Sequence, residues 1–172
     1  MPKIVIIGYS GSGKSTLANA LKEHYHIPVL HLDRVHFNSD WTERDKEVSK
    51  TILNKFMDDN TSYVIEGNYF SWGGRRFKEA DLVIELDYNR FFCFKEALKR
   101  YLKNRGKVSY SNGCVEKFDL EFAKWILYKG RTKKKKLTKQ KALEEISGTY
   151  LRFTSRKKLH TYLKQKEIEQ IA

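Results

Sequence analysis

The sequence predicts a single α/β domain in which a parallel sheet is covered by helices on both faces. Short apolar runs alternate along the chain with longer stretches whose apolar residues recur at helical spacing. A glycine-rich loop at residues 8–15 joins the first apolar run to the first helical stretch. With 172 residues, 40% of them hydrophobic, the chain has room for one compact domain over residues 1–172 and a small insertion, but hardly for two full domains.

The first half of the chain contains three predicted strands separated by two helices. Apolar runs bounded by polar residues or glycine indicate buried strands, whereas Val48, Ile52 and Phe56 recur on one side of a helix. In chain order the predicted elements are a strand over 3–7, a helix over 14–25, a strand over 28–32, a polar loop, a helix from near Trp41 to 58–60, a strand over 62–66 and its exit turn at 67–69.

The second half begins with a fourth strand and contains a fifth near its end. Asn89 is a favourable N-cap for a helix whose apolar side includes Phe94 and Leu98. Residues 104–116 are polar and punctuated by glycine, a loop length usually associated with function. The predicted elements are a strand over 82–84, helices over 117–128 and 132–146, a strand over 149–153 and a helix capped by Ser155 that ends near Glu169.

Residues 8–15 fit the pattern G-x-x-x-x-G-K-S/T and lie between a predicted strand and a predicted helix. The three glycines allow backbone conformations in which successive N–H groups face a phosphate, and the helix N-terminus adds partial positive charge. Lys14 supplies an ammonium for the β- and γ-phosphates, and the Ser15 hydroxyl is placed to bind Mg²⁺. We therefore expect ATP to bind at Gly8, Tyr9, Ser10, Gly11, Ser12, Gly13, Lys14, Ser15 and Thr16.

Polar residues follow the second and third predicted strands, where an open parallel sheet places its ligand site. Asp33 ends the second strand, and Glu66, Asn68 and Tyr69 end the third. We expect these residues to contact the acceptor substrate. The two carboxylates are also candidates to hold Mg²⁺ through water or to accept a proton from a substrate hydroxyl. The alternative for each carboxylate is a loop-capping role.

Histidines and cysteines do not form a recognisable metal or nucleophile site. His31 and His36 lie near Asp33, but without a fourth ligand a satisfied or surface histidine is favoured over a zinc ligand. Cys93 and Cys114 lack metal-ligand spacing and are expected to be reduced thiols of a cytoplasmic protein. The first strand begins within three residues, and no apolar stretch approaches the roughly 20 residues that span a bilayer, so neither a secretory signal nor a membrane span is expected.

Arginines near the predicted loops are candidates for phosphate contacts. Arg76 follows the third strand, close to the expected acceptor position, and Arg100 and Arg105 flank the entry to the polar loop 104–116. Phosphoryl transfer spreads negative charge over the γ-phosphate oxygens. An arginine guanidinium on a closing loop can donate paired hydrogen bonds to these oxygens. A surface role is the alternative for each arginine. Arg76 and Arg105 are the preferred functional pair.

The net charge of +13 is concentrated in the second half of the chain. Residues 1–89 carry 11 Lys and Arg against 13 Asp and Glu, whereas residues 90–172 carry 23 against 8, a balance of +15. The basic half can gather cations around phosphates or form a nucleic-acid surface. For the four lysines at 133–136 a solvated basic face is a third interpretation.

Several segments resemble those of P-loop kinases of the adenylate kinase and shikimate kinase type, and more narrowly the FlaR-like family of DNA topology modulation proteins. The similar segments span nearly the whole chain in order. They are residues 8–16, His31-Leu32-Asp33 followed by Trp41, residues 65–69, residues 80–84 with Leu86-Asp87, and residues 113–122 ending in Lys124-Trp125-Ile126. The last of these is much more family-specific than the phosphate loop.

The resemblance implies a five-stranded parallel core in the order 2-3-1-4-5, a lid around residues 104–130, and phosphoryl transfer from ATP with Mg²⁺. By position it implies phosphate and metal roles for Lys14 and Ser15, acceptor contacts for Asp33 and Arg76, and lid arginines at 100 and 105. Similar proteins usually carry Asp where this chain has Glu66, which keeps the charge but is one methylene longer.

Two functions are compatible with these features. The first is an ATP-dependent kinase in which Lys14, Asp33 and Arg105 act in catalysis and Arg100 binds nucleotide, with a small anionic acceptor that is shikimate-like, a nucleoside or a nucleotide. The alternative is an ATP-binding protein that associates with nucleic acid through the basic half and modulates DNA topology or gene expression. A GTPase switch is a weaker alternative, because the sequence contains neither a D-x-x-G nor an N-K-x-D segment. A monomer is the default expectation.

Overall fold

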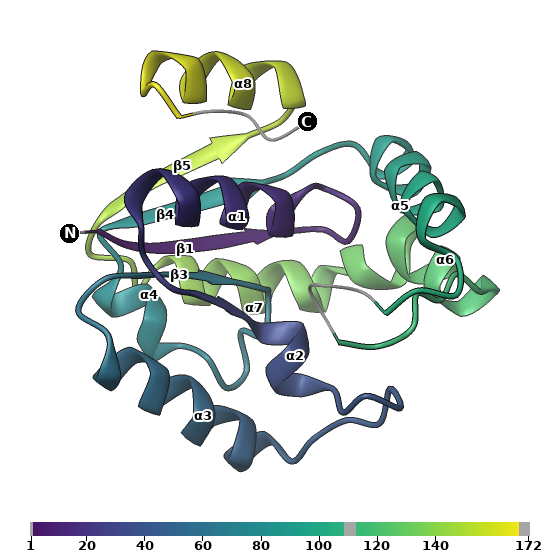
Figure 1. Ribbon diagram of the computed structural model, residues 1–172, viewed down its shortest axis with the longest axis horizontal. Coiled ribbons are helices and arrows are strands. Elements are labelled where there is room, and N and C mark those ends of the chain that lie inside the picture. The colour runs from purple at the N-terminus through teal and green to yellow at the C-terminus, as the bar shows by residue number, and fades with distance from the viewer. Residues whose placement is uncertain (1, 109–112, 169–172) are drawn as a thin grey trace.

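The computed structural model describes residues 2–108 and 113–168, whose five strands form one parallel sheet (Figure 1). The order β2-β3-β1-β4-β5 is the one that the resemblance implies, and all four strand pairs are parallel. The predicted fold class is therefore confirmed. The strands are β1 (Lys3–Gly8), β2 (Val29–His31), β3 (Tyr63–Glu66), β4 (Leu82–Leu86) and β5 (Thr149–Phe153).

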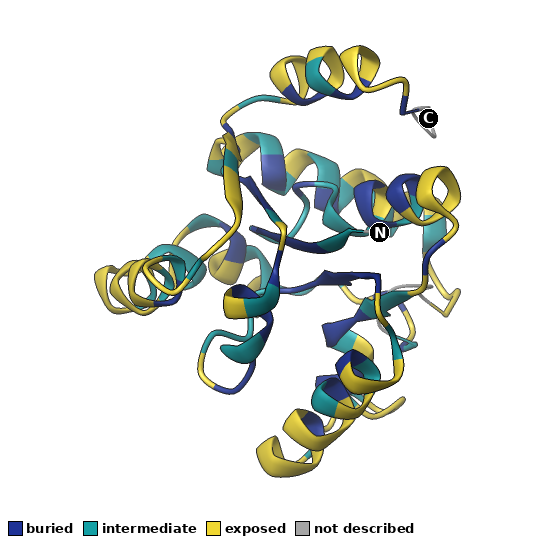
Figure 2. Cartoon of the chain, turned by 90° about the vertical axis from the view of Figure 1, so that its left-hand side faces the viewer, coloured by how far each residue is buried: buried dark blue, intermediate teal, exposed yellow. Residues whose placement is uncertain are grey.

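Helices cover both faces of the sheet because successive side chains of each strand point to opposite faces. Ile4 and Ile6 of β1 pack with α1 and α8, whereas Val5 and Ile7 pack with α4 and α7. Buried strands and outward-facing exposed helix surfaces are visible in Figure 2. The helices are α1 (Lys14–Tyr25), α2 (Leu32–His36), α3 (Lys46–Asp59), α4 (Arg75–Glu79), α5 (Arg90–Asn104), α6 (Leu120–Leu127), a 3₁₀ turn η1 (Lys129–Arg131), α7 (Lys133–Leu143) and α8 (Arg156–Gln165).

The segment between β2 and α3 departs most from the sequence-based prediction. Helix α3 begins at Lys46 and not near Trp41, because the Asp45 carboxylate caps it by accepting from the backbone of Glu47 and Val48. Trp41 itself has a left-handed backbone with φ of 67°, which no α-helix accommodates. Just before this segment, the short helix α2 occupies residues predicted as the end of a strand and a loop.

Other helix boundaries differ by a few residues. Asp119 caps α6 through the backbone N–H of Phe122, so the helix begins at Leu120 and not at 117. Helix α7 ends at Leu143, three residues before the predicted end. The last helix ends at Gln165, and the predicted end at 169 lies outside the described residues.

The parallel topology brings the carboxyl ends of all five strands to one edge of the sheet. The phosphate loop, α2 and the exit turn of β3 follow the first three of these ends, with α5 and α6 beside them (Figure 1). Helices α5 and α6 pack together, and the Phe94 and Phe118 rings meet at 5.6 Å between centroids. No helix in the described residues combines the length and the apolar character needed to cross a bilayer.

Candidate active site

The phosphate loop has the backbone that its sequence predicts. Gly11 and Gly13 adopt left-handed conformations with φ of 79° and 91°. A Cβ on Gly11 would lie 2.1 Å from the carbonyl oxygen of Cys93, so the first turn of α5 leaves no room for a side chain there. Lys14 Nζ donates to the Tyr9 carbonyl oxygen at 3.3 Å, a contact across the mouth of the loop. Helix α1 begins at Lys14, which places its positive dipole end at the loop.

Asn68 holds the start of the phosphate loop in place. Its side-chain Oδ1 accepts from the Gly8 backbone N–H at 3.0 Å, and its Nδ2 donates to the Gly8 carbonyl at 3.0 Å. This reciprocal pair joins the exit turn of β3 to the end of β1. Asn68 therefore has a structural task in addition to lining the cleft.

Glu66 connects the phosphate loop to β2. Ser15 Oγ donates to Glu66 Oε1 at 3.0 Å, and His31 Nδ1 lies 2.8 Å from the same oxygen. Burial raises the pKa of Glu66, but the hydrogen bond from His31 and the charge of Lys14 outweigh it, so the net pKa is lowered. His31 is buried and contacts Glu66, which makes it a core histidine and not a surface one. Among the described residues no group of three or more His, Cys, Asp or Glu could hold a metal.

Asp33 lies at the start of α2 and lines the cleft, close enough to Lys14 and Glu66 for their charges to act on it. The Tyr69 hydroxyl donates to Asp33 Oδ1 at 2.7 Å. Burial and the nearby negative charge of Glu66 raise the pKa of Asp33, despite the opposing effect of Lys14. The pKa of Asp33 is thus raised above its ordinary value, whereas that of Glu66 is lowered.

Arg76 does not reach the cleft, which corrects the expectation that it meets an acceptor. Its side chain is fully buried, and the guanidinium donates to the carbonyl oxygens of Gly67, Asn68 and Gly73. Because no carboxylate compensates for the burial, the pKa of Arg76 falls to about 9. These hydrogen bonds hold the exit turn of β3 in place, and with it Asn68 and Tyr69, which the turn carries.

Replacing Arg76 should destabilise the fold. We expect Arg76→Met to lower the free energy of unfolding by roughly 1–3 kcal/mol for each buried carbonyl left without a donor. Urea denaturation measures the loss, and Lys78→Met on the same helix is the control, because Lys78 is exposed and its ion pair with Glu145 is 3.9 Å long. Equal transition midpoints for the two variants would contradict a bracing role.

The predicted lid arginines occupy different positions from those expected. Arg100 lines the cleft, and its Nε lies 3.1 Å from the nearly buried Glu116 carboxylate. Arg105 is exposed and is not among the residues that line the cleft, so in this structure it does not reach the phosphate loop. Arg131 lies at that position instead. Its guanidinium stacks on the Tyr9 ring, 3.4 Å from the ring centroid, and donates to the Tyr88 carbonyl oxygen at 3.0 Å.

Sequence reasoning missed Arg131 because it stands one residue beyond the predicted lid in a strongly basic stretch. Nothing in its local pattern separates it from the neighbouring lysines. Only the packing of η1 against the phosphate loop distinguishes it.

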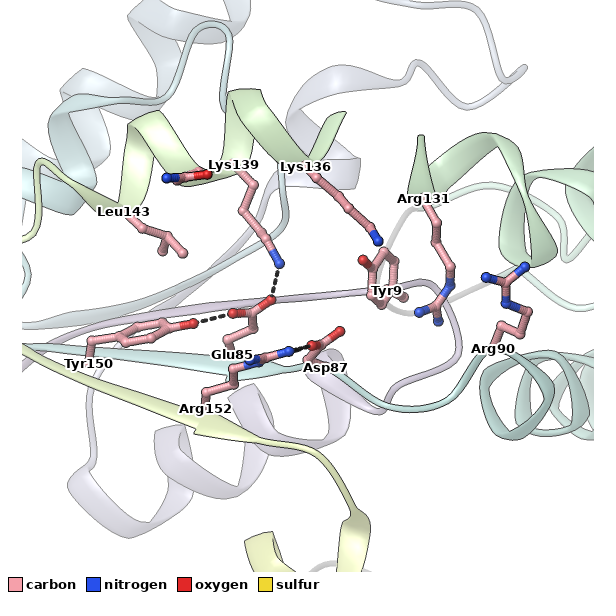
Figure 3. Close-up of a pocket in the computed structure, with 11 residues that line it drawn as sticks. Tyr9, Glu85, Asp87, Arg90, Arg131, Lys136, Lys139, Leu143, Tyr150 and Arg152 are labelled. Atoms are coloured by element: carbon pink, nitrogen blue, oxygen red, sulfur yellow. Dashed lines mark hydrogen bonds and ion pairs between the residues drawn. The ribbon is translucent and has the colours of Figure 1, made fainter. Parts of the chain in front are cut away.

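A pocket of about 380 Å³ lies beside Tyr9, between α7 and the ends of β4 and β5 (Figure 3). Lys139 pairs with Glu85 and Arg152 pairs with Asp87 along its floor, while Lys136 points toward Tyr9. Both Lys136 and Lys139 also line the main cleft. Part of the basic helix α7 therefore faces the site, which corrects the interpretation of a wholly solvated face.

The main cleft has a volume of about 1360 Å³ and runs from the phosphate loop to the acceptor side. Ligand sites usually measure about 300–1,000 Å³, so the cleft has room for two small molecules side by side. It contains every predicted nucleotide-binding residue except the buried Ser12, together with Asp33, Asn68, Tyr69 and Arg100. Glu66 lies beneath it, reached through Ser15.

Comparison with known proteins gives structural neighbours only. No protein-family model and no curated protein matches the chain. A shikimate kinase from Acinetobacter baumannii, solved in complex with shikimate, has a TM-score of 0.58 at 12% identity and matches over 98% of this chain and 96% of its own. A shikimate kinase from Bacteroides thetaiotaomicron has a TM-score of 0.56 at 15% identity over 95% of both chains.

An uncharacterized protein from Eubacterium ventriosum ATCC 27560 has a TM-score of 0.52 at 19% identity over 96% of this chain and 97% of its own. These matches agree with the strand order and with the left-handed glycines of the phosphate loop. The chain has the fold of the P-loop kinases. At such low identity the likeness extends to the fold alone, and the narrower resemblance to the FlaR-like family stays a prediction.

Proposed function

We propose that the protein is an ATP-dependent phosphotransferase that moves the γ-phosphoryl group of Mg-ATP to a hydroxyl of a small acceptor. The observation that carries the proposal is a cleft with room for two ligands that is lined both by the phosphate loop and by Asp33, a carboxylate of raised pKa. A hydrolase or a switch has no need of a second, elaborated subsite.

The phosphate end of the cleft fits a polyphosphate and a metal ion. Backbone N–H groups of the loop, the N-terminus of α1 and Lys14 would bind the β- and γ-phosphates. The Ser15 hydroxyl and the ionised Glu66 lie 3.0 Å apart and form an oxygen donor set suited to Mg²⁺, with Ser15 as ligand and Glu66 holding a metal-bound water. Bound Mg²⁺ supplies positive charge that offsets the charge developing on the phosphate oxygens.

Asp33 would act as the general base for the acceptor hydroxyl. As the acceptor oxygen forms its bond to the γ-phosphorus, the bond from that phosphorus to the β-phosphate oxygen breaks and ADP leaves. The hydroxyl proton goes to Asp33, whose raised pKa strengthens it as a base and which lines the cleft, whereas Glu66 lies beneath it. The hydrogen bond from Tyr69 would orient the carboxylate for this step.

We further propose that residues 104–130 form the lid and that Arg131, at its end, supplies the cation that Arg105 was expected to provide. Its stacking on Tyr9 places a guanidinium directly beside the phosphate loop. The guanidinium donates through Nε to the Ile126 carbonyl and through one terminal nitrogen to the Tyr88 carbonyl, so its other terminal nitrogen would be the donor to a phosphate oxygen.

Arg131 and Arg105 make a discriminating pair of variants. We expect Arg131→Ala to lower kcat/KM by roughly 10- to 100-fold, which corresponds to the loss of one hydrogen bond to a charged group. Arg105→Ala should leave kcat/KM within about twofold, since that side chain is exposed outside the cleft. Steady-state kinetics with the identified acceptor measures both, and the reverse ranking would restore the sequence-based assignment.

To test the function, the protein is incubated with γ-³²P-labelled ATP and a broad set of metabolites, and the labelled products are separated by chromatography. Label appearing in an organic product in the presence of Mg²⁺, and not with EDTA, is the expected result. Release of label only as inorganic phosphate with every acceptor would contradict phosphotransfer and leave an ATPase.

The proposed function explains why the second half of the chain is basic. Lys136 and Lys139 line the cleft where a polyphosphate would bind, and Arg131 lines the smaller pocket beside Tyr9. No observation on the described residues favours a nucleic-acid duplex over such a ligand. The alternative of DNA association therefore stays a sequence-based prediction, to be checked by binding measured at low and high salt.

A further inference from the structure

We propose that the acceptor is an uncharged alcohol carrying a planar ring, of the size and type of a nucleoside. This inference rests on the proposed function, because it names the substrate class of the same cleft. It also departs from the sequence-based expectation of an anionic acceptor. Two observations carry it: the aromatic rings on the acceptor side, and the lack of Lys and Arg among the described residues that line the cleft from segments 33–43 and 67–71.

Aromatic rings gather on the acceptor side of the cleft. Phe37, Trp41 and Tyr69 line it, each only partly buried. The Phe37 and Trp41 rings meet edge to face at 5.4 Å, and His36 lies against both Phe37 and Tyr69, at 4.6 Å and 4.7 Å between centroids. Partly exposed ring faces around a cleft favour a ligand that stacks, because aromatic rings gain energy from planar partners.

Trp41 is held in place by specific contacts. Its indole N–H donates to the Val115 carbonyl oxygen at 3.1 Å, and its left-handed backbone closes a tight turn onto Asn38. A bulky residue with positive φ is costly and persists where the surroundings require it. The nearby Cys114 thiol, whose sulfur lies 3.1 Å from the Asn38 carbonyl oxygen, joins the same two segments. The turn that carries Trp41 is thereby attached to the segment expected to form the lid.

Charges on this side disfavour an anion. The cleft-lining residues from segments 33–43 and 67–71 include the carboxylates Asp33 and Glu43 but no Lys or Arg. Arg34 is exposed outside the cleft lining, and the Arg44 guanidinium donates to the Val35 carbonyl and to Asn38 Oδ1. A phosphorylated acceptor would need an arginine fork or comparable donors there.

The cations that do approach Asp33 are already engaged. Arg100 lies near Asp33, but its charge is balanced by Glu116 at 3.1 Å. Lys14 belongs to the phosphate loop and is the group expected to bind ATP. A second phosphate group at this end would therefore face Asp33 and Glu43, and the described cleft-lining residues of segments 33–43 and 67–71 offer no Lys or Arg to compensate.

The test compares matched neutral and anionic ligands by calorimetry, with the protein held in Mg²⁺ and a non-hydrolysable ATP analogue. The probes are adenosine, cytidine, uridine, guanosine and thymidine, the 5′-monophosphate of each, and shikimate. We expect at least one nucleoside to bind at least tenfold tighter than its monophosphate and than shikimate. Preference for a monophosphate or for shikimate, or binding by none of the nucleosides, would overturn the inference.

Variants locate the binding surface. Trp41→Leu should weaken nucleoside binding by roughly 5- to 150-fold, the usual loss for one base–aromatic stacking contact, and Phe37→Leu provides a second measurement. Tyr128→Leu is the matched control, because Tyr128 is exposed and does not line the cleft. Unchanged affinity for the ATP analogue shows that each variant is folded. Equal nucleoside affinity in all three variants would contradict the proposed wall.

The same experiments separate this inference from the proposed function. If Mg-ATP binds and a monophosphate or shikimate is phosphorylated, the protein is a kinase and the inference about its acceptor is wrong. If a nucleoside binds at Trp41 but no phosphoryl group is transferred to it or to any other metabolite, the acceptor wall is correct and the proposed phosphotransfer is wrong.

Discussion

Asp33→Asn is expected to lower kcat by roughly 10²- to 10⁴-fold, the range for loss of a general base. The amide has nearly the shape of the carboxylate and can still accept the hydrogen bond from Tyr69, so the cleft should keep its geometry. It cannot take the proton of the acceptor hydroxyl. The loss should therefore appear mainly in kcat, with the acceptor KM much less affected.

The same substitution should stabilise the protein at neutral pH. The pKa of Asp33 in the folded chain lies above its ordinary value of 3.8, chiefly because of burial. Between these two values the folded state holds a proton that the unfolded state has released, so stability falls as pH rises through this window. At pH 7 the ionised Asp33 thus opposes folding, and an uncharged Asn does not.

Thermal unfolding at pH 7 and at pH 4, measured with the kinetics, checks both effects. The melting temperature of Asp33→Asn should exceed that of the wild type at pH 7, and the difference should shrink at pH 4. Asp58→Asn is the control, because Asp58 is exposed and its pKa is lowered by a hydrogen bond with Arg75. That variant should keep full activity without any gain in stability at pH 7. An active but unstabilised Asp33→Asn would remove Asp33 from the catalytic assignment.

Lys14→Ala is expected to abolish Mg-ATP binding at millimolar concentration and to lower phosphoryl transfer by at least roughly 10²- to 10³-fold, the cost of losing one preorganised charge-stabilising group. Among the described residues its ammonium donates to the Tyr9 carbonyl, an acceptor that water can reach in the cleft, so the fold should tolerate the change. Calorimetry with Mg-ATP measures binding, and circular dichroism verifies folding.

Lys22→Ala is the matched control for Lys14→Ala. Lys22 lies two turns further along α1, is exposed and pairs only with Glu23 at 3.5 Å. It carries the same charge on the same helix but points away from the phosphate loop. If Lys14→Ala bound Mg-ATP as well as Lys22→Ala does, the phosphate loop could not be the nucleotide site and the proposed function would fail with it.

The sequence was sufficient for the features that depend on local chemistry. Apolar runs alternating with helical periodicity predicted the five strands, because burial on both faces imposes those patterns on a parallel sheet. Gly11, Gly13 and Lys14 predicted the phosphate loop, because few other residues permit its backbone and charge. Asn89 and Ser155 were predicted as helix caps, because a short polar side chain satisfies the first N–H groups of a helix.

Only the tertiary structure decided which side chains meet. Arg76 and Arg105 look alike in the sequence, yet one is buried under three carbonyls and the other is exposed outside the cleft. Arg131 reaches Tyr9, more than a hundred residues away in the chain, because η1 packs over the phosphate loop. A local pattern reports the propensity of a segment, whereas burial and charge pairing depend on elements that come together only on folding. That is why the phosphate loop was predictable, and why the acceptor wall around Trp41 was not.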